Sequence, residues 1–193
     1  CKDTLKLMKT YDFLDGAMGV HPHSVKDLDV EAVSDLYRYC CGSDKVVAVG
    51  EIGLDYHYDF SPRDVQQEWF IEQIELAKEL ELPIIVHSRD AARDTFQIIK
   101  ESRAGSVGGV IHSYTGGPEL AQEYIRLGFY IGIGGMVTFP NVKKVIQSWN
   151  GLCWRQTAHI WRRCPTEGGE MIPGICPILR KPLPKSRGFP WRT

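Results

Sequence analysis

The sequence predicts an α/β fold of the TIM-like (β/α) barrel type, and three short segments carry this prediction. The segments VVAVGE (residues 46–51), PIIVHS (83–88) and GVIHS (109–113) are runs of apolar residues that reach a side chain able to bind a metal. Runs without alternation of polar and apolar residues are typical of strands buried on both faces of a parallel sheet. In a (β/α) barrel, such strands bring their functional side chains together at their C-terminal ends.

The elements between these segments follow from the spacing of apolar residues. Before residue 46, the pattern predicts a helix over 2–13, a strand over 16–20 and an amphipathic helix over 27–41. After the strand at 46–54, Ser61 is expected to be the N-cap of the longest helix, and Pro62 its first residue. The remaining elements are expected as strands over 83–88, 107–112 and 129–133, and as helices over 90–103, 119–127 and 140–148.

This alternation of strand and helix favours βαβ units as the topology. The pattern yields five strands, whereas a closed barrel has about eight, so we expect an incomplete barrel over residues 1–148 that lacks its first and last strands. Residues 149–193 are rich in proline and show no periodicity of either kind. We therefore predict that they form an irregular or disordered tail, separate from the partial barrel.

The overall composition excludes several classes of protein. The chain has 23 basic and 24 acidic residues, so it carries no strongly basic field for non-specific binding to nucleic acid or membrane. No apolar run is long enough to span a bilayer, and no signal peptide is visible. Its 6 cysteines lack the spacing of a disulfide framework, which favours reduced thiols in a cytoplasmic protein. Nothing in the sequence indicates an obligate protein partner.

Three side chains at the predicted strand ends are candidates for metal ligands: Glu51, His87 and His112. A carboxylate next to a buried apolar run is costly unless it is paired or bound to a cation. Taken singly, Glu51 could form an ion pair with a basic neighbour, and each histidine could be a hydrogen-bonded core residue. Their equivalent positions on three strands favour a divalent metal, either magnesium, manganese or zinc, with room for a bound water.

Three further residues near the predicted strand ends each have two possible roles. His23 is either a substrate contact or a plain turn residue after Pro22. Arg89 could bind a phosphate with its guanidinium group, or it could form a salt bridge with Asp90 or Asp94 at the start of the next helix. Asp55, which follows the second strand, either orients a ligand or lines the cleft.

The order of motifs resembles that of the TatD family of metal-dependent deoxyribonucleases. The resemblance rests on GVHPH (19–23), VGEIGLDY (49–56), PIIVHSRDA (83–91), HSYTGG (112–117) and YIGIGG (130–135), and it continues over residues 1–148. It implies a barrel of the metallo-dependent hydrolase superfamily that holds two divalent ions and hydrolyses phosphodiester bonds of DNA. It further implies that Glu51 bridges the metals and activates water, that His87 and His112 bind one metal, and that His23 and Arg89 contact the substrate.

Two departures from the family pattern concern the ends of the sequence. The first family strand, with its His-x-His pair, would precede Cys1, and the late Thr-Asp pair is not visible after Ser148. Synonymous codons for residues 153–170, read one base out of frame, can encode LETDSPYLAPVPYRGRR, which contains that pair and the family's Pro-Tyr motifs. We therefore interpret residues 149–193 as a frameshifted segment. The alternatives are an inactive remnant of such an enzyme, or a related metallohydrolase that acts on another ester or amide.

Overall fold

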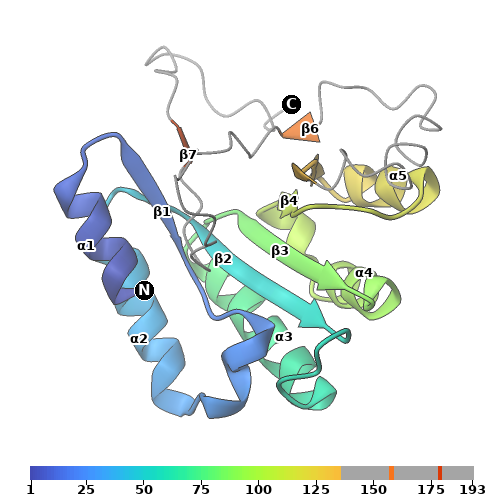
Figure 1. The fold of residues 1–193 in the computed structure, drawn as a ribbon, viewed down its shortest axis with the longest axis horizontal. Helices are drawn as coiled ribbons and strands as arrows, with labels where there is room; N and C mark the ends of the chain where they lie inside the picture. Colours follow the sequence, from blue (N-terminus) through green and yellow to red (C-terminus); the bar gives the residue numbers. More distant parts are fainter. Residues whose placement is uncertain (136–156, 159–177, 180–193) are drawn as a thin grey trace.

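The computed structural model describes residues 1–135, 157–158 and 178–179, which form one sheet with helices packed against it (Figure 1). Five strands run parallel in the order β5-β4-β3-β2-β1. Their bounds are Leu14–Met18 (β1), Val46–Asp55 (β2), Ile84–Arg89 (β3), Gly109–Ile111 (β4) and Phe129–Gly132 (β5). The predicted parallel α/β arrangement is therefore confirmed.

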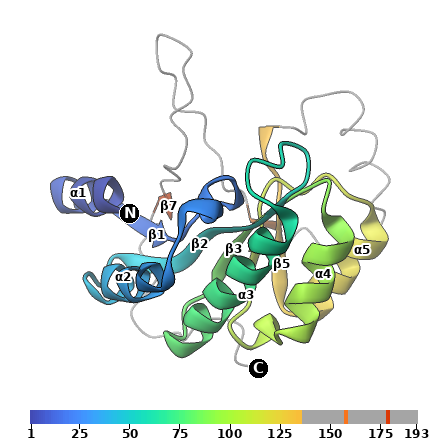
Figure 2. The same cartoon turned by 90° about the horizontal axis from the view of Figure 1, so that it is seen from below.

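Helices connect these strands, and α3, α4 and α5 lie on the same side of the sheet (Figure 2). The α-helices are Lys2–Thr10 (α1), Val30–Cys41 (α2), Arg63–Glu79 (α3), Ala92–Glu101 (α4) and Pro118–Arg126 (α5). Two short 3-10 helices, Pro22–Asp27 (η1) and Ala104–Ser106 (η2), complete the connections. None of the helices in the described part of the chain is both long enough and apolar enough to cross a bilayer.

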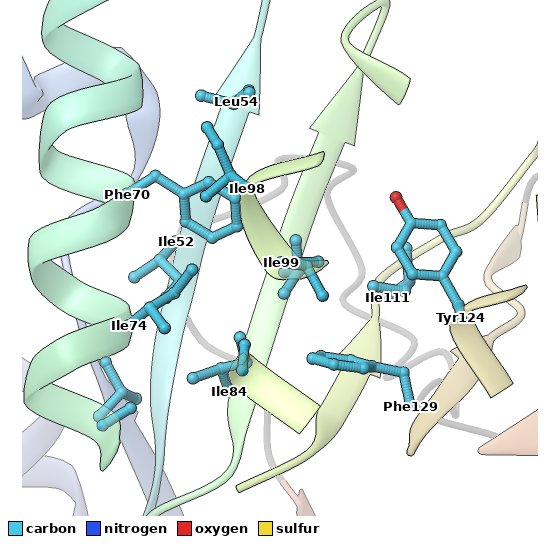
Figure 3. Packing of buried hydrophobic residues seen from close by; sticks show 14 of the residues in the cluster. Ile52, Leu54, Phe70, Ile74, Ile84, Ile98, Ile99, Ile111, Tyr124 and Phe129 are labelled. Atoms are coloured by element: carbon cyan, nitrogen blue, oxygen red, sulfur yellow. The ribbon is translucent and has the colours of Figure 1, made fainter. Parts of the chain in front are cut away.

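The hydrophobic core lies between the sheet and this helical layer. Phe70 and Ile74 of α3 pack with Ile52 of β2, and all three are fully buried (Figure 3). Tyr124 of α5 and Phe129 of β5 continue the core at the other end of the sheet. Because burying a large apolar side chain contributes about 1.5–3 kcal/mol, this layer holds the strands in register and fixes where they end.

Most predicted elements are found within a few residues of their expected bounds, but the predicted N-cap of the longest helix is wrong. The N-cap of α3 is Pro62, and the helix begins at Arg63. The Ser61 side chain instead accepts a hydrogen bond from the backbone N–H of Lys26, at 3.2 Å, and is fully buried. The hydroxyl group therefore ties the loop before α3 to η1 and does not cap the helix.

Two strands of two residues extend the sheet on either side. Thr157–Ala158 (β6) pairs in parallel with β5, and Ile178–Leu179 (β7) pairs antiparallel with β1. The helix predicted over 140–148 and the rest of the predicted tail at 149–193 lie outside the described residues. The division of the chain at residue 148 and the frameshift interpretation stay predictions.

Candidate metal centre

Three adjacent strands bring Glu51, His87 and His112 together: Glu51 lies within β2, His87 lies within β3, and His112 follows directly after β4. In the parallel pairing of β2 and β3, Gly53 is aligned with His87, and in that of β3 and β4, Val86 is aligned with Ile111, one residue before His112. One carboxylate oxygen of Glu51, Oε1, lies 3.4 Å from Nδ1 of His87 and 3.8 Å from Nε2 of His112. The three side chains that the sequence selected are thus neighbours in space.

Glu51 has an unsatisfied buried oxygen at the centre of this group. Its Oε1 atom is inaccessible to solvent and has no hydrogen-bond partner among the described residues. Burial alone would raise the pKa of Glu51, but the neighbouring His87 and His112 imidazoles outweigh it and lower the pKa. Glu51 is therefore a carboxylate at neutral pH. Its side chain is 32% exposed, but the Oε1 atom is out of solvent, and a charged oxygen in that position favours a bound cation.

Asp55 organises the imidazoles around Glu51. It is fully buried, and its Oδ2 atom lies 2.9 Å from Nε2 of His23 and 2.9 Å from Nε2 of His87. Its Oδ1 atom accepts hydrogen bonds from the backbone N–H groups of His57 and Tyr58, each at 3.0 Å. Burial would raise the pKa of Asp55, but these hydrogen bonds hold it well below its usual range.

The tautomer of His87 follows from the ionisation of Asp55. An ionised carboxylate can only accept hydrogen bonds, so Nε2 of His87 carries a proton that it donates to Asp55. In the neutral ring, Nδ1 then presents its lone pair to Oε1 of Glu51. Burial lowers the pKa of His87, but the charges of Glu51 and Asp55 overcome this and raise it. Nδ1 of His87 and Oε1 of Glu51 are thus two electron-pair donors 3.4 Å apart, an arrangement that could bind a divalent metal. A proton on Nδ1 would compete with that metal.

His21 and His23 extend the cluster from the segment that follows β1. One ring nitrogen from each of His21, His23 and His87 lies within 4.8 Å of the others, so these residues could also hold a metal ion. Burial, followed by the charge of His87, lowers the pKa of His21 from 6.5 to about 4. His21 is therefore a neutral imidazole at neutral pH, the form that binds metals. Because His87 belongs to both groups, it links them into one site.

Two glutamines of α3 fix the loops that carry these residues. The Gln66 side chain accepts a hydrogen bond from the backbone N–H of Asp55 at 2.8 Å and donates to the carbonyl groups of Asp55 and Ser61. The Gln73 side chain accepts from the backbone N–H of Val20 at 2.6 Å and donates to the carbonyl of Val20. Both glutamine side chains are almost fully buried, so α3 holds the segment before His21 and the end of β2.

The rim beside this cluster carries cationic and aromatic side chains. The guanidinium group of Arg89 lies 4.7 Å from the ring centroid of Tyr58. The predicted alternatives for Arg89 were salt bridges to Asp90 or Asp94, and neither is present. Asp90 instead contacts Nδ1 of His57 at 2.9 Å, and Asp94 accepts a hydrogen bond from the hydroxyl group of Tyr56.

Comparison with known proteins decides the family. The sequence pattern of the family described as TatD related DNase matches residues 1–152. The chain belongs to the TatD family. Over 140 residues it is 46% identical to the uncharacterized metal-dependent hydrolase YabD of Bacillus subtilis (strain 168), covering 72% of this chain and 54% of that protein. The chain thus spans about half the length of the curated relatives it matches.

Other members of the TatD family give the same picture. The chain is 39% identical over 126 residues to a protein of Rahnella sp. (strain Y9602) named 3'-5' ssDNA/RNA exonuclease TatD, covering 65% of this chain and 48% of that protein. Among solved structures, the TatD homologue YjjV of Escherichia coli K12 is similar with a TM-score of 0.74 at 32% identity, covering 81% of this chain and 60% of that one. A TatD family hydrolase of Entamoeba histolytica is similar with a TM-score of 0.67 at 29% identity, covering 76% and 52%. These likenesses confirm the TIM-like α/β class.

In this TatD family chain, two residues of the cluster lie outside the ligand set predicted from sequence: His21 and Asp55. His21 was not proposed as a ligand, although it precedes Pro22 and His23 at the end of a predicted strand. Asp55 was given no definite role, although it follows Glu51 on the same strand by four residues and lies at its end. The position of Asp55 at the end of a buried strand could have indicated its role, because a carboxylate there needs hydrogen-bond or charged partners.

Proposed function

We propose that this site binds divalent metal ions and hydrolyses phosphodiester bonds of DNA. The observation that carries the proposal is the buried, unpartnered Oε1 atom of Glu51, which faces Nδ1 of His87 and Nε2 of His112. Family membership supports metal-dependent hydrolysis, and the relative named as an exonuclease supports a nucleic acid substrate. The ion is magnesium, manganese or zinc, all of which accept carboxylate and imidazole ligands.

Each residue has a distinct part in this proposal. Glu51, His87 and His112 would hold the ion, and Glu51 would accept the proton of the attacking water. A divalent ion bound here would lower the pKa of water and polarise a phosphoryl oxygen. Asp55 keeps Nδ1 of His87 unprotonated by accepting the Nε2 proton. Arg89, whose guanidinium group is exposed, and His23 contact the substrate, with Arg89 as the phosphate ligand.

Cleavage of a 3′-labelled oligonucleotide tests the proposal. The wild-type chain should cleave in the presence of Mg²⁺, Mn²⁺ or Zn²⁺ and lose this activity in EDTA, and Glu51→Ala should lose it with the metal present. Tyr37→Ala is a matched control, because Tyr37 is exposed on α2. Metal binding without cleavage would favour the non-catalytic alternative. Cleavage that survives both EDTA and Glu51→Ala would exclude this site as the catalytic centre.

A further inference from the structure

We propose that His21, His23 and His87 form a second metal position, which binds a nitrogen-preferring transition metal such as nickel and, when occupied, takes His87 away from Glu51. The existence of this position is independent of the proposed function, but its competition with Glu51 rests on it. One ring nitrogen from each of the three histidines lies within 4.8 Å of the others. His21 and His23 come from the start of η1 and His87 comes from β3, so two separate segments build the trio. The family resemblance assigns a second ion to the His-x-His pair of the family's first strand and not to these residues.

Asp55 orients two of the three rings. Its Oδ2 atom lies 2.9 Å from Nε2 of His23 and 2.9 Å from Nε2 of His87, so one carboxylate aligns both imidazoles. The centroid of the His21 ring lies 4.2 Å from that of His23 and 4.5 Å from that of His87. Ligand atoms that share one ion, with bonds of about 2.1 Å, stand roughly 3 to 3.4 Å apart, so small rotations of the rings would complete the site. The Oδ2 atom of Asp55 is close enough to both imidazoles to serve as a fourth ligand.

His21 is available to a metal ion. Burial lowers its pKa to about 4, so the ring is neutral at neutral pH and carries no charge that would repel a cation. Its Nδ1 atom accepts a hydrogen bond from the backbone N–H of His23 at 3.3 Å, which is long for such a bond. A metal that took the single lone pair of the ring would replace this weak contact.

His87 is the residue for which the two metal positions compete. Its Nδ1 atom faces Oε1 of Glu51 at 3.4 Å, and its Nε2 atom faces Asp55 on the side of His23. A neutral imidazole has a ring lone pair on only one of its two nitrogens, so His87 can serve one position at a time. A metal on Nε2 would leave the ring proton on Nδ1, where it could be donated to Oε1 of Glu51, an atom without a hydrogen-bond partner among the described residues. The carboxylate that loses its metal partner would thus gain a hydrogen bond.

The two positions have different sets of ligand atoms and should therefore select different ions. Imidazole nitrogens favour nickel, copper and zinc, whereas magnesium and manganese prefer the oxygens of carboxylates and water. The trio offers three imidazoles, and the position at Glu51 offers a carboxylate with two imidazoles. We therefore expect nickel to prefer the trio and manganese to prefer Glu51. A bound nickel ion would then block the proposed catalytic centre by occupying His87.

Calorimetric titration of the untagged, metal-free chain tests this position, with Ni²⁺ and Mn²⁺ as the two probes. The wild-type chain should bind both ions. His21→Gln should weaken Ni²⁺ binding by about 10-fold or more, since loss of even an outer partner of a metal ligand costs this much, and should leave Mn²⁺ binding unchanged. Glu51→Gln should have the opposite effect. His57→Gln is the matched control, because His57 lies in the neighbouring loop, is exposed and pairs with Asp90; it should bind both ions as the wild type does.

Competition between the two ions tests whether His87 is shared. Mn²⁺ loses its sharp EPR signal when it binds to a protein, so added Ni²⁺ should restore that signal with the wild type and leave it unchanged, at the same concentration, with His21→Gln. His23→Gln serves as a second variant in case His21→Gln does not fold. Equal Ni²⁺ binding by the wild type and both variants, or Ni²⁺ and Mn²⁺ bound at the same time, would overturn the inference. Ni²⁺ binding that depends on His21 in a chain that never cleaves DNA would refute the proposed catalysis alone, whereas Mn²⁺-dependent cleavage with Ni²⁺ binding indifferent to His21 would refute this metal position alone.

Discussion

Replacement of Asp55 by asparagine tests how the imidazoles are held. The amide of Asp55→Asn keeps one oxygen, which can still accept the backbone N–H groups of His57 and Tyr58. Its nitrogen would then face Nε2 of both His23 and His87, which each lie 2.9 Å from Oδ2 in the wild type. Two N–H donors would meet a third donor in a fully buried position.

The magnitude follows from these contacts. A buried donor left without an acceptor costs about 1–3 kcal/mol, so two such donors should lower the free energy of unfolding by about 2–6 kcal/mol. His87 could avoid this cost by moving its proton to Nδ1, but Nδ1 would then be unable to bind the metal that the proposed site would share between His87 and Glu51. Loss of an outer partner of this kind typically weakens metal binding by about 10- to 100-fold.

Two measurements check both consequences. Urea unfolding in EDTA at pH 7 gives the change in the free energy of unfolding, and calorimetric titration with Mn²⁺ gives the change in metal affinity. Asp59→Asn is the matched control, because Asp59 lies in the same loop but is exposed and pairs with Arg63; its unfolding midpoint should not move. If Asp55→Asn unfolds and binds Mn²⁺ as the wild type does, Asp55 does not set the tautomer of His87.

Three further predictions concern single features of the site. Because the pKa of His21 falls from 6.5 in the unfolded chain to about 4 in the fold, the unfolded state binds more protons between these values, and stability should fall as pH falls through this window. In urea titrations in EDTA, His21→Gln should reduce that loss by about 1–2 kcal/mol after allowance for solvent screening, and an identical pH slope would contradict this. Gly53→Ala should cost about 3 kcal/mol or more in urea unfolding, since Gly53 has a φ of +134° and an added Cβ would lie 2.1 Å from the carbonyl oxygen of His87. Gly135→Ala, where an added Cβ would meet no atom of the described residues within 4 Å, should be nearly neutral, and equal losses would exclude this steric reason. Mn²⁺ at about 100 times its Kd should raise the free energy of unfolding by about 2.7 kcal/mol, and Glu51→Gln should lose most of this gain; an unchanged wild-type melting temperature would argue against the metal centre.

The strands that position the site were predictable because their sequences are unbroken runs of apolar residues. A run such as VVAVG, apolar on every residue before the glycine, is typical of a strand buried on both faces, and parallel strands align their C-terminal ends. The grouping of Glu51, His87 and His112 followed from that geometry alone. The strands that carry these side chains, β2, β3 and β4, are adjacent in the sheet.

The role of Asp55 and the position of Arg89 could not be predicted, because they depend on side-chain contacts between distant segments. Asp55 contacts His23, which is 32 residues earlier, and His87, which is 32 residues later, and no local pattern encodes either distance. The sequence also allowed Arg89 two acidic neighbours, and the choice of Tyr58 as its partner depends on how the loop between β2 and α3 folds. Ser61 misled the prediction for the same reason, since its partner Lys26 is remote in the chain.

Gln66 and Gln73 are seven residues apart on α3, which places them two turns apart along one face of the helix. Each amide holds a different connection, one at Val20 and the other at Asp55. Helix α3 therefore fixes the distance between the segment at Val20, which precedes His21, and the end of β2 at Asp55. This distance does not depend on the rigidity of either segment. A single residue inserted between the two glutamines would rotate one amide by about 100° relative to the other and pull the two halves of the site out of alignment, with every strand left intact.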